Sequence, residues 1–349
     1  MDSTILMYLV RDGVTTGAIY ALLGVALVLV FAVTRVIFVP QGEFVAFTAL
    51  SLVAFEEGST PGLAKLLAVL GVLAVVSRLY RARHDLPFRT GLLIFASELL
   101  PPFVTLGLVQ LLAPMKLGLV VSIPLTLVMV VQMGAVLYRI VFEPLARASV
   151  LVLLIAAFAV HMVLVGLGLY FFGPEGFRTS PYADVNFSFG ALNVNLQDLI
   201  VLTTSVALMT GLWWFFAATR PGKALRASAV NRVGASLVGI PTERAGQIAF
   251  AMAAAIGAIS GALIAPVTTV YYDIGFVIGL KGLVAAVLGG LASYPLTVLA
   301  AFMIAGTESA ASFWASGYKE VIVFLLIVPV LLWRSVASPH AEEDEERDL

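Results

Sequence analysis

Residues 219–248 read TRPGKALRASAVNRVGASLVGIPTERAGQI, a polar stretch between two segments that are almost wholly apolar. The stretch contains one acid, Glu243, and five basic residues, Arg220, Lys223, Arg226, Arg232 and Arg244. An excess of Lys and Arg between membrane spans is typical of a cytoplasmic loop. Within it, residues 224–239 predict a short helix with an apolar face, formed by Leu225, Val233, Leu237 and Val238. Such a helix indicates a docking element for a soluble partner.

The composition of the whole chain is that of a membrane protein. Of the 349 residues, 61% are hydrophobic and 12% are charged, whereas a typical soluble domain is roughly 25% charged. We therefore predict an all-α, polytopic bundle of transmembrane helices in a lipid bilayer. The net charge of −1 argues against nucleic acid as a partner. The absence of cysteine excludes disulfides and thiol chemistry.

The predicted spans follow from the length of the apolar segments, because a helix needs about 20 residues to cross the bilayer core. Ten or eleven segments are expected, at residues 14–34, 42–57, 63–80, 91–113, 117–139, 150–173, 197–219, 245–270, 276–292, 295–313 and 318–334. The segments at 42–57 and 276–292 are short enough to be half-helices or re-entrant pieces. Residues 1–3 lack the positive charge of a cleavable signal peptide, so the first segment is expected to remain as a helix.

The charges of the loops predict the orientation of the chain. The basic loops at 78–89, 139–147 and 220–244 are separated by even numbers of spans and would all be cytoplasmic. The loop at 174–195 would face the opposite side. Residues 1–335 are therefore interpreted as one transmembrane domain, and the acidic residues at 336–349 as a disordered cytoplasmic tail.

Glycines occur inside the predicted spans at a spacing of four. The pairs Gly13 and Gly17, Gly257 and Gly261, and Gly275 and Gly279 would let helix backbones approach closely, with ordinary packing within the bundle as the simpler interpretation. A denser group of helix breakers predicts a discontinuous helix of the kind that borders transport routes: Gly275, Gly279, Gly282, Gly289, Gly290 and Pro295. The same reasoning applies to Gln41, Gly42 and Glu43, which follow Pro40.

The ionisable side chains expected at membrane depth are Glu43, Glu98, Lys281 and Glu308. An unpaired charge is costly there, so each indicates a functional role. Structural alternatives remain open: hydrogen bonding at helix ends for Glu43 and Glu308, pairing for Glu98, and for Lys281 a side chain that reaches the headgroups. His161, isolated in an apolar run, is interpreted as a core residue in preference to a proton relay.

The sequence contains no recognisable catalytic or metal-binding motif. Gly222 and Lys223 are followed by Ala224 and lack the first glycine of a phosphate-binding loop. The three histidines are far apart and show no metal-ligand spacing. We therefore expect no cofactor, no metal and no ATP hydrolysis by this chain.

Nine blocks, in order along most of the chain, carry a family resemblance: GAIYALLGVAL (17–27), RVIF (35–38), QGEF (41–44), FEPL (142–145), FGPE (172–175), TRPGKALRA (219–227), ASLVGI (235–240), GLKGLVAAVLGG (279–290) and GTE (306–308). In these blocks the chain resembles the permeases of branched-chain amino acid ABC transporters. The resemblance implies a multi-pass subunit of an ATP-driven importer in the bacterial inner membrane. Its partners would be a second, homologous permease, two cytoplasmic ATP-binding subunits and a periplasmic substrate-binding protein.

Two sets of site residues follow from the motifs and the resemblance. The set expected to couple the chain to the ATPase is Arg226, Arg232, Val233, Gly234, Ala235, Leu237 and Gly239. The set expected to border the translocation pathway is Gln41, Gly42, Glu43, Lys281, Gly289, Gly290 and Glu308.

The chain departs from the family pattern in three places. Val233 stands where the family has a Glu in its docking element, and Ser335 follows Arg334 where the family has a Pro. Residues 60–115 form an unusually long segment that predicts an extra helical hairpin. The substrate is left open, because the resemblance extends to permeases for urea, short amides and aromatic acids. An ion-coupled secondary transporter is the main alternative and would need coupling-ion ligands and an inverted repeat; an intramembrane enzyme would need a convergent polar constellation.

Overall fold

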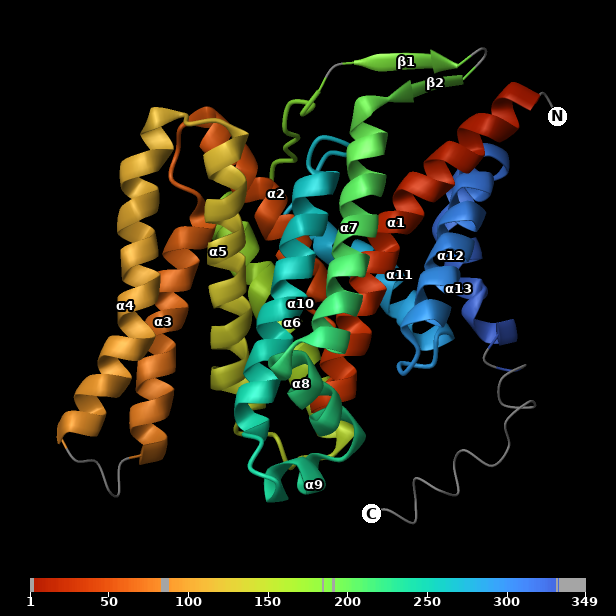
Figure 1. The fold of residues 1–349 in the computed structure, drawn as a ribbon. Helices are drawn as coiled ribbons and strands as arrows, with labels where there is room; N and C mark the ends of the chain where they lie inside the picture. The colour runs from red at the N-terminus through yellow and green to blue at the C-terminus, as the bar shows by residue number, and fades with distance from the viewer. Residues whose placement is uncertain (1–2, 83–87, 184, 190–191, 331, 333–349) are drawn as a thin grey trace.

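The computed structural model describes residues 3–82, 88–183, 185–189, 192–330 and 332. These residues form an all-α bundle with one small β-hairpin (Figure 1). The helices are α1 (Ser3–Thr34), α2 (Gln41–Glu57), α3 (Gly62–Ala82), α4 (Phe88–Leu112), α5 (Leu119–Leu137), α6 (Val150–Phe172), α7 (Leu196–Ala218), α8 (Arg220–Val230), α9 (Arg232–Leu237), α10 (Thr242–Ile264), α11 (Ile274–Leu288), α12 (Tyr294–Trp314) and α13 (Lys319–Leu325). The antiparallel strands are β1 (Asn186–Phe189) and β2 (Leu192–Asn195).

Eight of the described helices are long and apolar enough to cross a membrane: α1, α3, α4, α5, α6, α7, α10 and α12. The helices α2 and α11 have only 17 and 15 residues. At 1.5 Å per residue they reach about 26 and 23 Å, less than the roughly 30 Å of the bilayer core. The predicted short elements at 42–57 and 276–292 are therefore confirmed, while the exact number of membrane crossings remains a prediction.

The first and the last of the predicted spans differ from the helices that the structure shows. The first helix begins at Ser3 and not near residue 14, because tertiary contacts hold its first turns: Arg11 pairs with Asp198 (2.9 Å), and Gly13 packs against Gly306. The predicted span at 318–334 is interrupted by a turn at Leu326. Pro329 explains this turn, since it has no N–H to donate to the carbonyl four residues earlier. The predicted acidic tail at 336–349 lies outside the described residues.

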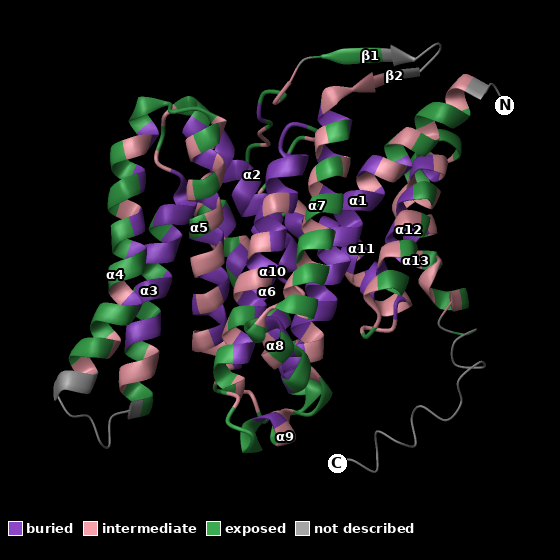
Figure 2. Cartoon of the chain, in the orientation of Figure 1, coloured by how far each residue is buried: buried purple, intermediate pink, exposed green. Residues whose placement is uncertain are grey.

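Helix α2 lies at the centre of the bundle. Its residues from Gln41 to Val53 are buried without interruption, so this part of the helix has no exposed face (Figure 2). It packs on α10, α11 and α5. It ends at Gly58, whose positive φ of 79° lets the backbone N–H return to the last carbonyls of the helix.

The predicted glycine pairs lie at the helix crossings. A Cβ added to Gly261 of α10 would lie 2.5 Å from the Val45 carbonyl oxygen in α2, and one added to Gly275 of α11 would lie 2.7 Å from the Gly42 carbonyl oxygen. A Cβ on Gly13 of α1 would meet the backbone of α12 at 3.1 Å. Small residues here permit close backbone approach, and the simpler interpretation, packing within the bundle, is confirmed.

The connections of the bundle gather at two opposite ends (Figure 1). The first, which we call the basic end, carries α8, α9, the end of α3 and the connection between α5 and α6; the second, the hairpin end, carries β1 and β2. Contacts join the basic loops directly, because Arg81 donates to the Arg139 carbonyl (3.0 Å) and Arg232 to the Ala146 carbonyl (3.3 Å). The three basic loops therefore share one end, as predicted.

Helices α3 and α4 pack against each other as a helical hairpin beside α5 (Figure 1). Inside it the Glu98 side chain is fully buried, and its Oε1 accepts hydrogen bonds from Arg78 (2.7 Å) and Arg139 (2.5 Å). The pairing expected as the structural alternative for Glu98 is confirmed. That this hairpin is an addition to the family pattern remains a prediction.

The single helix predicted over 224–239 is wrong, because the structure has two helices there. Asn231 leaves the helical region (φ −150°, ψ 103°) and caps α9 by accepting the Gly234 N–H at 2.7 Å. The predicted single apolar face is also wrong. Leu225 of α8 packs into the bundle against Leu29 and Val33, whereas Val233 and Leu237 of α9 are exposed.

Candidate functional site

A carboxylate and an imidazole meet in the interior of the bundle. The Oε1 of Glu43 lies 2.6 Å from the Nδ1 of His161, and both side chains are almost fully buried. His161 is the twelfth of the 23 residues of α6, so the pair lies halfway along a membrane span. The Phe276 ring of α11 stacks on the imidazole, with ring centroids 4.6 Å apart. The Oε2 of Glu43 has no hydrogen-bond partner among the described residues.

The pair lies where two short helices begin. Glu43 is in the first turn of α2, and Phe276 is in the first turn of α11. The two helix starts touch backbone to backbone, since a Cβ on Gly42 would overlap the Gly275 carbonyl oxygen and one on Gly279 would lie 2.9 Å from the Gly42 nitrogen. Helix N-termini carry partial positive charge, which favours a carboxylate at this position. Short helices that begin at membrane depth are a feature of transport sites.

Gln41 does not join this pair. Its Nε2 donates to the Ala253 carbonyl of α10 at 2.9 Å, while Glu43 contacts α6. Residues two apart on a helix do not share a face, so the structure separates two residues that the sequence placed in one group. The Oε1 of Gln41 is also buried and has no partner among the described residues.

Lys281 and Glu308 form a second, partly buried cluster. The Nζ of Lys281 donates to Glu308 (2.5 Å) and to Glu320 (3.1 Å), and the Tyr20 hydroxyl donates to Glu308 (2.8 Å). Lys281 is only 4% exposed, so the structural alternative in which its side chain reaches the headgroups is wrong. The sequence analysis missed Glu320, which stands in no recognisable motif, and did not single out Tyr20 within the block at 17–27. The cluster joins α1, α11, α12 and the start of α13.

Gly289 and Gly290 lie at the far end of α11, about 21 Å from Gly275 at 1.5 Å per residue. Gly290 has a positive φ of 77° and turns the chain towards α12. A Cβ on Gly289 would lie 2.7 Å from the Thr297 backbone nitrogen. These glycines therefore close a tight connection at the basic end and do not contact Glu43.

The short helices α8 and α9 present apolar side chains at the basic end. Val230, Leu237 and Val238 are 85%, 82% and 77% exposed, and Val233 is also exposed. A shallow hollow of about 620 Å³ runs between the two helices, with Lys223 and Arg226 on its rim. Ala235 faces inward and is buried, and Gly239 ends α9 with a positive φ of 84°.

Arg232 connects α9 to the helical core. Besides the Ala146 carbonyl, its guanidinium interacts with the hydroxyl of Tyr138. Tyr138 begins the π-helical turn Tyr138–Phe142 that extends α5. Its ring packs on Phe250 (5.1 Å between centroids), which in turn contacts Phe38 (4.8 Å). Phe38 lies three residues before α2, so this chain of contacts runs from α9 to the start of the central helix.

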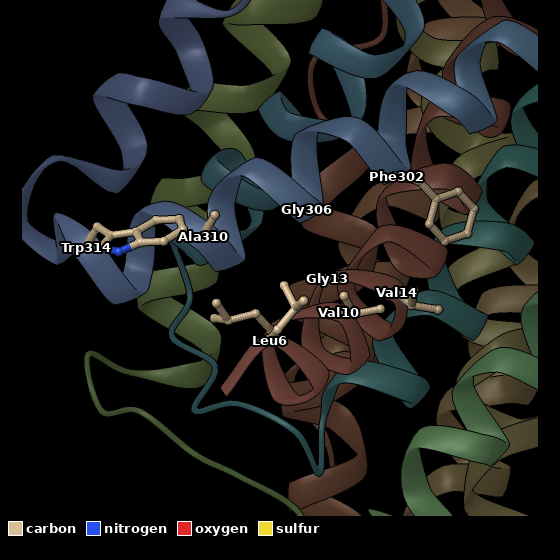
Figure 3. Close-up of a pocket in the computed structure, with 9 residues that line it drawn as sticks. Leu6, Val10, Gly13, Val14, Phe302, Gly306, Ala310 and Trp314 are labelled. Carbon is tan, nitrogen blue, oxygen red and sulfur yellow. The ribbon is translucent and has the colours of Figure 1, made fainter. Parts of the chain in front are cut away.

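A further hollow of about 290 Å³ lies at the hairpin end between α1 and α12 (Figure 3). Its lining residues are entirely apolar or glycine, with Gly13 and Gly306 at the crossing of the two helices (Figure 3). Trp314 closes one end. It brings together none of the predicted site residues.

Comparison with known proteins places the chain in a family. Residues 88–331 match the family model for the permease component of branched-chain amino acid transport systems. The chain is 31% identical over 202 residues to the high-affinity branched-chain amino acid transport system permease proteins LivH of Salmonella typhimurium (strain LT2) and of Escherichia coli (strain K12), covering 56% of this chain and 65% of each relative.

BraD of Pseudomonas aeruginosa, also a high-affinity branched-chain amino acid transport system permease protein, is 27% identical over 208 residues, 58% of this chain and 68% of the relative. The matched part of the chain thus spans somewhat less than two thirds of LivH. No solved structure matches the chain significantly. The family model covers most of the helical bundle, and the chain therefore belongs to the family of branched-chain amino acid transport permeases.

Proposed function

We propose that the chain is the membrane-spanning permease subunit of an ATP-driven ABC importer. Its substrates are branched-chain or related hydrophobic amino acids, or similar small solutes such as amides, urea or aromatic acids. Transport runs from periplasm to cytoplasm across the inner membrane of a bacterial cell. Membership of a transport permease family supports the class of function. The observation that carries coupling to ATP is the uncovered apolar surface of α9 at the basic end.

The positions of Val230, Leu237 and Val238 favour a soluble partner over lipid. These side chains lie beyond the last residue of α7 and before the first of α10, in the basic connection between two spans. Exposed apolar patches rimmed by polar residues mark protein interfaces, and the positive charge of this loop indicates the cytoplasmic side. We assign this surface to an ATP-binding subunit. The docking residues are Arg226, Arg232, Val233, Gly234, Ala235, Leu237 and Gly239.

The pair of Glu43 and His161 is the proposed midpoint of the translocation pathway. Polar groups at this depth are costly and indicate function, and the two helix starts beside them provide irregular backbone of the kind that borders transport routes. Gln41, Gly42, Lys281, Gly289, Gly290 and Glu308 support the same route by holding α2, α11 and α12 in position.

The mechanism that fits these contacts is alternating access. ATP binding by the partner subunits displaces α8 and α9, and Arg232 transmits the displacement to Tyr138 and the aromatic rings beneath α2. A second permease completes the pathway, and a substrate-binding protein delivers the solute at the hairpin end. The partner ATP-binding subunits, and not this chain, hydrolyse ATP.

One observation favours the alternative of an ion-coupled secondary transporter. A buried carboxylate in contact with a histidine is the kind of group that carries protons in such proteins. The importer is preferred, because a secondary transporter has no need of the exposed apolar surface of α9.

The two functions are distinguished in proteoliposomes. The chain is purified with its co-eluting partners, and uptake of labelled leucine is measured with substrate-binding protein and ATP, or with a pH gradient alone. We expect co-elution of an ATP-binding subunit and uptake that requires ATP. Uptake by the chain alone under a pH gradient, without ATP, would establish the secondary transporter instead.

A further inference from the structure

A groove on the outer surface of the bundle has the shape of a lipid site. It encloses about 390 Å³ between α7 and α12, with Val25 of α1 at its base. Its walls are apolar or aromatic and come from residues between Met209 and Ala217 on α7 and between Tyr294 and Val298 on α12. Arg226 of α8 lies on the lining at the basic end.

The length of the groove matches one leaflet of a bilayer. From Met209 to Ala217 the wall rises about 12 Å at 1.5 Å per residue, and half of the bilayer core is roughly 15 Å. Trp213 and Trp214, near the end of α7, are strongly exposed. Tryptophans are enriched where the acyl chains meet the headgroups, so the groove runs from this interface into the hydrocarbon region.

Arg226 is the charged member of the described lining. Its guanidinium makes no hydrogen bond or ion pair with any described residue, and neither does the ammonium group of Lys223, three residues earlier on the same face of α8. Two cations without acidic partners thus stand where the apolar groove reaches the headgroup level. An anionic headgroup complements this charge.

We propose that this groove binds an anionic phospholipid, with one acyl chain between α7 and α12 and the phosphate on Arg226. The apolar wall, about as long as one leaflet, and Arg226 at its headgroup end, unpaired among the described residues, support a lipid over a protein segment. The assignment gives Arg226 a role that does not depend on the proposed importer. The bound lipid would fix α8, and so the surface of α9, against the membrane.

The test measures lipid bound to the purified full-length chain. The protein is incorporated into nanodiscs that contain equal amounts of phosphatidylglycerol and phosphatidylcholine, and after transfer to detergent the retained lipid is counted by native mass spectrometry. Two variants alter the site: Arg226→Gln removes the charge, and Ala217→Trp fills the groove. Their matched controls are Arg244→Gln, an exposed arginine in the first turn of α10, and Ala218→Trp, an exposed neighbour that does not line the groove.

We expect one phosphatidylglycerol to be retained by the parent chain and by both controls, and at least a tenfold loss in Arg226→Gln and Ala217→Trp. Equal retention of phosphatidylcholine, or equal retention in all variants, would overturn the proposal. Because the chain has no cysteine, Ala217→Cys gives a second readout. Disulfide-linked dimers of this variant in native membranes would show that a second copy covers the groove, and would also overturn the proposal, whereas labelling by a lipid-soluble maleimide supports it.

Discussion

The contact between Glu43 and His161 changes how the roles of both residues are interpreted. Alone in an apolar run, His161 resembles an ordinary core residue, and Glu43 resembles a helix-end carboxylate. Their contact at 2.6 Å places a polar pair halfway along a span, with Phe276 stacked over the imidazole. One carboxylate oxygen remains without a partner among the described residues, so the pair has capacity for a further donor.

The first prediction tests this pair. Glu43→Ala removes a hydrogen bond to a buried polar ring, a loss of about 1.5–3 kcal/mol for bonds that involve a charged group. We expect uptake to fall at least tenfold, measured as ATP-dependent uptake in proteoliposomes at equal protein content. Glu43→Gln keeps the hydrogen-bonding shape without the charge.

If Glu43→Gln retains uptake, the role of Glu43 is a structural hydrogen bond. If Glu43→Gln loses uptake, transport requires the negative charge of Glu43. Full activity in both variants would remove Glu43 from the pathway.

At the scale of the helices, the close contact of α2 and α11 depends on glycine. The backbone of Gly275 leaves no room for a Cβ at Gly42, and the reverse approach from Gly275 is also within 2.7 Å. Both helices are short, and their starts meet in the interior. The geometry of the proposed pathway is therefore set by small residues on two elements that are far apart in the sequence.

The second prediction follows from this contact. Gly42→Ala must push α2 and α11 apart and should destabilise the chain by about 1–3 kcal/mol, the usual cost of overpacking. Thermal unfolding in detergent, followed by tryptophan fluorescence, measures the change. Gly166→Ala is the control, because a Cβ there meets nothing within 4 Å. Equal melting temperatures for the two variants would contradict the close approach. Gly168 is unsuitable as a control, since Phe47 lies 3.1 Å from its added Cβ.

The third prediction concerns α9. Leu237 is 82% exposed, so Leu237→Asp should leave the fold intact. In a complex the same change places a charge in an apolar interface, which costs roughly 2–5 kcal/mol. We expect the chain to insert normally and to lose its ATP-binding partner on co-purification. Normal assembly and uptake with this variant would disprove docking at α9.

Across the whole molecule, Arg232 is the proposed connection between the docking surface and the pathway. It contacts the Ala146 carbonyl and Tyr138, and the aromatic contacts of Tyr138, Phe250 and Phe38 continue to the start of α2. Such a path is a physical hypothesis until both ends are shown to respond to one change.

The fourth prediction supplies that test. Arg232→Ala should lower the number of solute molecules imported per ATP hydrolysed by about tenfold, the effect of roughly 1.4 kcal/mol of coupling free energy. ATP hydrolysis and uptake are measured on the same proteoliposomes. Arg244→Ala is the control, because Arg244 is exposed at the same end. If Arg232→Ala lowered ATP hydrolysis and uptake in equal proportion, Arg232 would contribute to assembly with the ATP-binding subunits and not to coupling.

The sequence alone determined the class of this protein and the course of its helices. A long apolar segment such as 150–173 forms a helix in lipid, because a helix satisfies every backbone N–H and C=O group by hydrogen bonds within the segment. Loop charges predicted which connections share an end, and the short lengths of 42–57 and 276–292 identified the two unusual elements. Each of these properties is local, so composition and spacing suffice to find them.

Only the tertiary structure decided which residues meet. It joined Glu43 to His161 across 118 residues and Lys281 to Glu308 across 27, and it separated Gln41 and Gly290 from the pair. It also divided the predicted docking helix at Asn231, where a cap replaces a helical residue. The physical reason is that helix packing in lipid depends on the fit of small and large side chains on facing helices. That fit depends on two segments that are distant in the sequence, so it cannot be predicted from either segment alone.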